Sequence, residues 1–569
     1  MNEAESAGRR LRPWTGTALL LWAVVMLCAF LAEGETPRPR RTVFNDDGQV
    51  IAEAPQENTS AFVRAWLDRE ADFVPFTTFV FLAATPDVCF YDTKAGERYG
   101  ARFGEDFDKG WGRGLRRLRH EGTDPLRLAA EHMRAKGFEV LAAVRMNDTH
   151  HRSLDPGNPL CPQFATDHPE YVIRQPDGRT NETALDYSHA EVRAHRLAIM
   201  REIAEEYPVD GLDLNFVRWA KHFPRDQGRE KAPVMTAYLG QIREMLDAAA
   251  AQRGRDRLTL GVRVPESLHA CWLAGLDVRA WVEHGWVDYV VVSTWNNTDP
   301  QVPVGEFTAF AKPAGVQTLV AMGNMIGAIW DGPPVMFDRC VAMSAKHGPG
   351  YQGMLITEAE ARAAAANYYA WGADGVAFWN VGIHFGAAKT AAPEQRERIR
   401  RWTSAVVDFA CVNDGPRWYH YLPMGKGMSS RKPPARNYPW YDEGTSPLGQ
   451  PNGPILTFPP DSLGKRRVFP FRMADGRNGE PLAGWLAFRV YHMTPEAHIE
   501  VDVNGRPVGS PQLERRDVDP RTQLTGVRFE IDLADCPAFR GENQLGLTLR
   551  RASEGDHVPY MEELEVFVE

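Results

Sequence analysis

The feature that most constrains this chain is an alternation between short apolar runs and amphipathic helical stretches, which starts near residue 76. Such alternation is typical of βα units whose parallel strands share one sheet. The runs lie at 77–84, 139–146, 184–187, 211–217, 258–264, 287–294, 317–322 and 375–379. They predict an α/β fold, a (β/α)8 TIM-like barrel. An open doubly wound sheet is the alternative, but no Gly-rich phosphate loop follows the first run.

Two helix starts are predicted from spacing alone. Ser188 with Glu191, and Thr357 with Glu360, have the three-residue separation of a capping box. We expect a helix to begin at each of them, one before the fourth run and one before the eighth.

Composition divides the chain into five segments: an export signal at 1–32, an N-terminal segment at 33–75, the barrel at 76–410, a Pro/Gly-rich linker at 411–454 and a β-sandwich at 455–569. The last segment contains short strand-like runs and the turn Asn504-Gly505, a strong hairpin signal. This accessory domain could bind carbohydrate or could serve only for packing or spacing.

The N-terminus has the layout of an export signal. Arg9, Arg10 and Arg12 precede an uncharged apolar run at 18–32. The run is shorter than the roughly 20 residues that a membrane span needs, so the membrane is a partner only if this segment is an uncleaved anchor. We therefore expect an exported protein that is periplasmic, extracellular or associated with the cell envelope.

Charge and cysteine usage exclude several classes. The net charge is −10 with a pI near 5.9 and no long basic run, which argues against nucleic acid as a partner. The 7 cysteines are widely scattered, which favours buried free thiols over a disulfide framework. His150 and His151 beside Asp148 suggest a metal, but no HxH or HExxH spacing supports one. We expect neither a metal nor a cofactor.

Candidate binding residues stand where strands end, because barrel chemistry lies at the carboxyl ends of the strands. Flat tryptophan faces and planar amides match a sugar ring, which has C–H faces and hydroxyl edges. One strand-end tryptophan is usually core, but three at equivalent places favour binding. The expected sugar-binding residues are Arg145, Asn147, Asp148, His150, Asp186, Asn215, Arg218, Trp219, Trp295, Asn296, Asn324, Trp379 and Asn380.

The fourth run carries the first catalytic candidate. Period-2 alternation places Asp213 and Asn215 on one face and the two neighbouring leucines on the other, so we expect the acid to point into the barrel near its mouth. A carboxylate there needs a partner, and Arg145 or Arg218 could provide it. A purely structural ion pair is the alternative interpretation of Asp213.

Glycoside hydrolysis usually needs two carboxyl groups, one acid and one base or nucleophile. Glu266, just past the fifth run, is the expected partner of Asp213, with Asp148 and Asp186 as rivals. No glutamate stands at the ends of the last three runs, which weakens an enzymatic interpretation. No Gly-x-Ser-x-Gly elbow is present, so a serine hydrolase of the α/β type is disfavoured.

Residues 75–410 resemble the bacterial glycosyl hydrolase-like family 10 group. The matching stretches are YDTK at 91–94, RMNDTH at 145–150, LDYS at 185–188, DGLDLNF at 210–216 and GADGV at 372–376. The resemblance implies a TIM-like barrel, export and action on a polysaccharide. In many relatives the fourth strand carries two acids where this chain has Asp213 and Asn215, and an asparagine cannot serve as acid, base or nucleophile.

The sequence therefore predicts an exported glycoside hydrolase-like protein that acts on a polysaccharide or glycoside by carboxylate acid/base hydrolysis. The main alternative is a non-catalytic carbohydrate-binding barrel of the cell envelope, which Asn215 favours. A third possibility is a structural envelope protein, because barrels host many functions.

Overall fold

The computed structural model describes most of the chain beyond residue 39. The described residues are 40–53, 59–151, 153–174, 183–218, 220–224, 226–294, 297–331, 340–342, 351–379, 381, 393–421, 456–476, 482–494, 496–509, 512–516, 526–552, 558–561 and 563–569. The predicted export signal lies outside them. Within these ranges, no helix combines the length and the apolar character that crossing a membrane requires.

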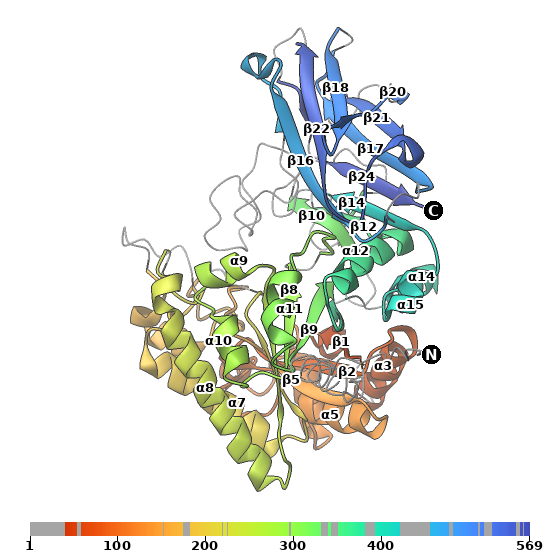
Figure 1. Ribbon diagram of the computed structural model, residues 1–569. Helices are drawn as coiled ribbons and strands as arrows, with labels where there is room; N and C mark the ends of the chain where they lie inside the picture. The colour runs from red at the N-terminus through yellow and green to blue at the C-terminus, as the bar shows by residue number, and fades with distance from the viewer. Residues whose placement is uncertain are drawn as a thin grey trace, which may run out of the picture. The chain divides into compact units, whose positions relative to one another are not determined.

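Eight parallel strands close into a barrel, which confirms the predicted fold class (Figure 1). In sheet order they are β1 (Thr42–Asp46), β13 (Gly375–Trp379), β9 (Gln317–Met322), β8 (Tyr289–Ser293), β7 (Thr259–Pro265), β6 (Gly211–Asn215), β5 (Glu139–Arg145) and β2 (Thr78–Ala84). The ring closes because β1 also pairs with β2. Short strands β3 (Val88–Cys89) and β4 (Glu97–Arg98) extend the sheet beyond β2.

A helix follows each barrel strand before the next one begins, and Figure 1 shows helices on the outside of the strands. These helices are α3 (Thr59–Phe73), α5 (Pro125–Ala135), α7 (Ala190–Glu206), α8 (Gly228–Gln252), α10 (Val278–Glu283), α11 (Gly305–Ala311), α12 (Glu358–Ala370) and α14 (Pro393–Ser404). Shorter helices are α2 (Gln49–Glu53), η1 (Ala101–Phe103), α4 (Gly112–His120), α6 (Gln163–Asp167), η2 (Pro169–Tyr171), α9 (Leu268–Leu273) and α15 (Phe409–Val412).

One predicted strand is wrong, and another strand takes its place. Residues 184–187 form no barrel strand, and Leu185 makes only an isolated antiparallel bridge with Val172. The missing strand is β1, which lies in the segment that the sequence placed before the barrel. All five residues of β1 are buried, but the run is brief and has charged residues at both ends, so its composition resembled a loop.

The inward and outward faces of β6 are as predicted. The leucines at 212 and 214 belong to the hydrophobic core that the helices cover, and both are fully buried. Asp213 and Asn215 alternate with them and are also buried. They therefore point into the barrel.

The two predicted capping boxes had different outcomes. Thr357 Oγ1 accepts from Glu360 N at 3.2 Å, and Glu360 Oε2 accepts from Thr357 N at 2.8 Å, which confirms the second box. The first is wrong, because α7 begins at Ala190 and Ser188 N instead donates to Asp186 Oδ1 at 2.8 Å.

The C-terminal domain consists of two antiparallel sheets around their own core, which agrees with a sandwich-like fold. One sheet contains β14 (Arg417–Tyr421), β15 (Leu456–Thr457), β17 (Gly484–Tyr491), β20 (Gln512–Arg516), β21 (Gly526–Asp532), β23 (Tyr560–Met561) and β24 (Leu564–Val568). The other contains β16 (Arg466–Met473), β18 (His498–Val503), β19 (Arg506–Pro507) and β22 (Gly541–Arg551). Two short 3-10 helices, η3 (Pro460–Ser462) and η4 (Leu533–Asp535), complete it.

The predicted hairpin turn is confirmed. Asn504 and Gly505 join β18 to β19 with φ of 54° and 77°, the left-handed conformation that a tight two-residue turn requires. A separate three-stranded antiparallel sheet follows β9 in the barrel, formed by β10 (Met325–Asp331), β12 (Tyr351–Leu355) and β11 (Cys340–Ala342).

Five cysteines whose side chains the structure describes are free thiols, and four of them are buried. The free cysteines are Cys89, Cys161, Cys271, Cys411 and Cys536, of which only Cys411 is half-buried rather than buried. The prediction of buried free thiols is therefore confirmed for the other four.

The barrel interior predicts a strict requirement for glycine at position 261. A Cβ there would lie 2.1 Å from the Tyr289 ring, so Gly261→Ala should lower the free energy of unfolding by about 1–3 kcal/mol. Gly509→Ala is the control, because nothing lies within 4 Å of its Cβ position. Denaturant unfolding of both variants measures the difference, and equal stabilities would contradict the packing described.

Candidate functional site

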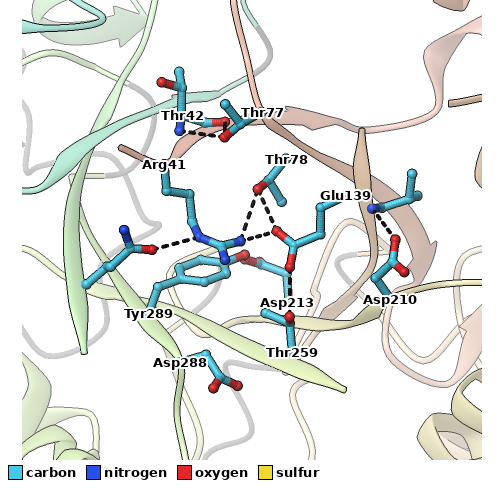
Figure 2. Close-up of polar contacts among 12 residues, drawn as sticks. Arg41, Thr42, Thr77, Thr78, Glu139, Asp210, Asp213, Thr259, Asp288 and Tyr289 are labelled. Atoms are coloured by element: carbon cyan, nitrogen blue, oxygen red, sulfur yellow. Dashed lines mark hydrogen bonds and ion pairs between the residues drawn. The ribbon is translucent and has the colours of Figure 1, made fainter. Parts of the chain in front are cut away.

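A closed polar network fills the amino-terminal end of the barrel (Figure 2). Arg41, which precedes β1, forms an ion pair with Glu139 and donates to Thr78 Oγ1 and Gln317 Oε1, each at 3.0 Å. Thr259 donates to the other Glu139 oxygen at 2.7 Å. The first residues of four strands take part: Thr78, Glu139, Thr259 and Gln317. Together with Arg41, we call these residues the floor network.

Asp213 faces the floor network and not the mouth. Its carboxylate accepts a hydrogen bond of 2.5 Å from Tyr289, whose ring lies 4.8 Å from the Arg41 guanidinium (Figure 2). Gly261 pairs with both residues in register, and its missing side chain lets Tyr289 cross to the acid. The predicted partnership of Asp213 with Arg145 or Arg218 is therefore wrong.

Asp213 is 3% exposed, and its contacts describe a structural role. Burial raises the pKa of its carboxyl group, which the Tyr289 hydrogen bond only partly offsets. Active sites of such barrels lie at the carboxyl-terminal ends of the strands, whereas Asp213 is the middle residue of β6 and accepts a hydrogen bond from Tyr289 at the start of β8. The catalytic role that the sequence suggested for Asp213 stays a prediction.

A second set of inward residues meets at the carboxyl-terminal end, and we call it the mouth ring: Asn45, Arg145, Asn215, Arg263 and Trp379. Asn215 pairs in register with both arginines, on β5 and β7. The Arg263 guanidinium lies 3.6 Å from the Trp379 ring centroid, and Trp379 pairs in register with Asn45. None is more than 6% exposed, so five strands contribute to one buried polar surface.

Several polar atoms at this end are buried without a hydrogen-bond partner among the described residues. They are Asn45 Oδ1, Asn215 Nδ2, Trp379 Nε1 and Glu266 Oε2. Each such atom costs about 1–3 kcal/mol of stability. A combination of unpaired donors and acceptors suits the hydroxyl groups of a ligand.

Glu266 is a buried acid directly after β7. It is 1% exposed, and burial together with the nearby Asp299 carboxylate raises the pKa of Glu266 well above its usual range. Burial also raises the pKa of Asp299 to about 6. Glu266 therefore holds its proton at a pH where ordinary carboxyl groups have lost theirs.

Asp148, in contrast to Glu266, is an acid that its neighbours keep ionised. Arg145 Nη1 donates to it at 2.6 Å, and Arg145 Nη2 lies 2.8 Å from Asp47. Burial alone would raise the pKa of Asp148, but His150 and Arg145 outweigh burial and hold it well below its usual range. The two carboxylates in turn raise the pKa of Arg145.

His150 and Arg218 continue this chain of contacts. His150 Nδ1 lies 2.5 Å from Asp148 Oδ1, and Arg218 Nη2 lies 2.9 Å from His150 Nε2. Arg145, Asp148, His150 and Arg218, all predicted from sequence, are thus brought together by the ends of β5 and β6.

Other predicted residues hold loops in place. Asn147 donates to the carbonyls of Leu185 and Lys221. Asn324 donates to Val381 O at 2.5 Å and accepts from Trp402 at 3.2 Å. Asp186 accepts from Ser188 N, as described above. Trp219, Trp295, Asn296 and Asn380 lie outside the described residues.

Sequence reasoning missed three residues at this end of the barrel. Asn45 and Asp47 were missed because β1 was not recognised as a strand. Asp299 lies farther past β8 than the strand-end residues predicted from that run. The polar run Asn297-Thr298-Asp299 was the available signal for it.

A metal centre finds no support in the described part of the chain, where no group of three or more His, Cys, Asp or Glu side chains could hold an ion. The nitrogen of His150 nearest to Asp148 is within hydrogen-bonding distance of that carboxylate, as described above.

The sequence matches no known protein-family model and none of the curated proteins. Among solved structures, the chain is similar to a glycoside hydrolase family 18 N-acetylglucosaminidase from Paenibacillus barengoltzii, with 13% identity, a TM-score of 0.35, and coverage of 64% of this chain and 98% of that chain. It is similar to the PgaB (BpsB) glycoside hydrolase domain from Bordetella bronchiseptica, with 12% identity, a TM-score of 0.38, and coverage of 64% and 98%.

A third similar structure is the Group IV chitinase of Ostrinia furnacalis, solved in complex with allosamidin. The identity is 11% and the TM-score 0.38, with coverage of 65% of this chain and 100% of that chain. At these values the likenesses carry no argument about this chain.

Because Asp213 lies beside the floor network, we expect its substitution to change the stability of the protein and not ligand binding or turnover at the mouth. Tyr289→Phe leaves a buried carboxylate unsatisfied and should lower the free energy of unfolding by about 1–3 kcal/mol. Because the pKa of Asp213 is raised on folding, its contribution to stability is lost as pH rises through that pKa. Asp213→Asn should therefore gain stability relative to the wild type as pH increases.

Unfolding experiments across a pH series test both variants, together with binding of ligands at the mouth. A tenfold loss of binding or turnover in Asp213→Asn, with stability unchanged, would show that this acid acts at the mouth after all.

Proposed function

We propose that this protein is a carbohydrate-active barrel of the glycoside hydrolase type, with its site at the carboxyl-terminal mouth. The observation that carries the proposal is Glu266, a buried acid with an unpartnered oxygen and a raised pKa, directly after a barrel strand. A carboxyl group that stays protonated is the proton donor that cleavage of a glycosidic bond needs.

The mouth supplies the second requirement, a surface suited to a sugar. Trp379 contributes an indole N–H, Asn215 an amide donor and Asn45 an amide acceptor, all without partners among the described residues. Hydroxyl groups of a sugar ring can satisfy each of these atoms. The substrate class that follows is a polysaccharide or another glycoside.

Two finer statements belong to the same proposal. The motifs at 91–94, 145–150 and 210–216 support a relation to glycosyl hydrolase-like family 10. The three arginines and the apolar run of the N-terminus support export, with the mature protein in the periplasm, the cell envelope or outside the cell.

A non-catalytic carbohydrate-binding barrel is the second candidate function. Asn215 favours it, because an amide occupies the inward position nearest the mouth on β6, and its Oδ1 accepts from the main-chain N–H groups of Val217 and Arg218 at 3.1 Å. An asparagine held in this way can orient a ligand but cannot transfer a proton in hydrolysis.

The proposal predicts that Glu266→Gln abolishes most of the turnover. The amide keeps the size of the side chain but cannot act as an acid, so kcat should fall about 10²–10⁴-fold with little change in KM. Hydrolysis of a panel of polysaccharides and aryl glycosides measures the effect.

Glu131→Gln, an exposed change on α5, is the matched control and should retain full activity. Full turnover in Glu266→Gln would exclude it as the acid. Sugar binding without turnover in the wild type would support the binding protein instead, and no sugar binding in any form would overturn the proposal.

Export makes a separate prediction. When the full chain is expressed in a bacterium, the exported protein should begin beyond residue 32, as determined by N-terminal sequencing or intact mass. A membrane-bound product that retains the apolar run would identify an anchor, and a full-length protein in the cytosol would contradict export.

A further inference from the structure

His150 lies at the mouth in a contact pattern that serves proton transfer. Its Nδ1 is 2.5 Å from Asp148 Oδ1, and its main-chain N–H donates to the same oxygen at 2.9 Å. Its side chain is 34% exposed, whereas that of Asp148 is 4% exposed. The imidazole thus links a buried carboxylate to the solvent side of the mouth.

The contacts of the His150 ring indicate which of its nitrogens carries the proton. A guanidinium can only donate, so Arg218 Nη2, at 2.9 Å, requires a lone pair on His150 Nε2. The proton is then on Nδ1 and points to Asp148. This is a neutral imidazole oriented by a carboxylate, with the basic nitrogen directed away from that carboxylate.

The carboxylate itself is firmly held. Its second oxygen accepts from Arg145 at 2.6 Å, and Arg145 is bound in turn to Asp47 at 2.8 Å. The ends of β1, β5 and β6 therefore fix the orientation of one histidine. A general base needs such an orienting group, since a freely rotating imidazole presents its lone pair in the wrong direction.

We propose that His150 Nε2 takes the proton of the water molecule that attacks the anomeric carbon, while Glu266 gives its proton to the leaving glycosidic oxygen. The inference rests on the function proposed above and names the second proton-handling residue of that site. The new C–O bond forms as the glycosidic C–O bond breaks, and solvent then returns the proton from the imidazolium to the glutamate. No cofactor enters the reaction.

The strand order places the two groups on opposite sides of one strand. His150 follows β5, Glu266 follows β7, and β6 lies between them. Two interstrand steps separate β5 from β7 by about 10 Å. Inverting glycosidases need roughly 6.5–9.5 Å between their acid and their base, which leaves room for a water molecule.

The charged groups that face His150 act in opposite directions. Its partial withdrawal from water lowers the pKa of His150, Asp148 raises it, and Arg218 and Arg145 lower it, with a net decrease. A base with a lowered pKa and an acid with a raised pKa are both in the active form at intermediate pH. Arg218 has to release Nε2 when the substrate binds, for which a sugar hydroxyl can accept its N–H.

The test is the pH dependence of kcat/KM for the wild type, His150→Gln and His150→Ala on a substrate that the wild type hydrolyses. In the wild type, kcat/KM should fall on the acidic side as His150 is protonated and on the basic side as Glu266 is ionised. In both variants kcat/KM should be about 10²–10⁴-fold lower than in the wild type. Its fall on the acidic side should disappear from the pH profile, while its fall on the basic side should remain. Added imidazole should partly restore His150→Ala.

A matched control is available in the same chain. His132 lies 2.7 Å from Asp68 between α5 and α3, an Asp–His pair of the same chemistry away from the mouth. His132→Ala should leave the activity and its pH profile unchanged. Thermal unfolding of each variant separates loss of activity from loss of structure. If His150→Ala does not fold, His150→Gln alone tests the role of His150.

The outcomes distinguish this inference from the function on which it rests. An unaltered acidic limb in folded His150→Gln, with normal turnover, overturns the role of His150 and leaves the glycoside hydrolase proposal standing. A loss of activity without a change in the pH profile and without rescue by imidazole overturns it as well. No turnover by the wild type on any glycoside overturns both.

Discussion

The ion pair between Arg41 and Glu139 and the hydrogen bond between Tyr289 and Asp213 close one end of the barrel. A buried charge is tolerated only when it is paired and hydrogen-bonded. The floor meets this condition because side chains from the starts of several strands satisfy one another. Asp213, the most conspicuous acid of the sequence, is hydrogen-bonded to Tyr289 beside this floor.

The polar groups at the mouth are of two kinds. Charged groups such as Arg145 and Asp148 are tied to each other, so they are fixed in position and contribute little reactivity of their own. Neutral or protonated groups such as Asn215, Trp379 and Glu266 retain unpartnered atoms among the described residues. Fixed charges around unsatisfied hydrogen-bonding atoms are a preorganised environment, which favours binding of a polar ligand with little rearrangement.

The C-terminal domain is joined to the barrel by more than the chain connection. Glu360 caps α12 with one carboxylate oxygen and contacts His420 of β14 with the other at 3.0 Å, and both side chains are almost completely buried. The residue that starts a barrel helix thus also contacts the accessory sheet. The capping box predicted from spacing is therefore also part of a domain contact, which the spacing could not indicate.

Local patterns in the sequence determined the barrel class, most of its strands, the inward face of Asp213 and Asn215, and the cluster of Arg145, Asp148 and His150. These follow from alternation and from adjacency along the chain. The tertiary structure alone decided that β1 completes the ring, that Asp213 belongs to the floor, and that Asp47 joins the mouth. The reason is physical: closing a barrel staggers its strands, and only that stagger decides which distant side chains an inward residue meets.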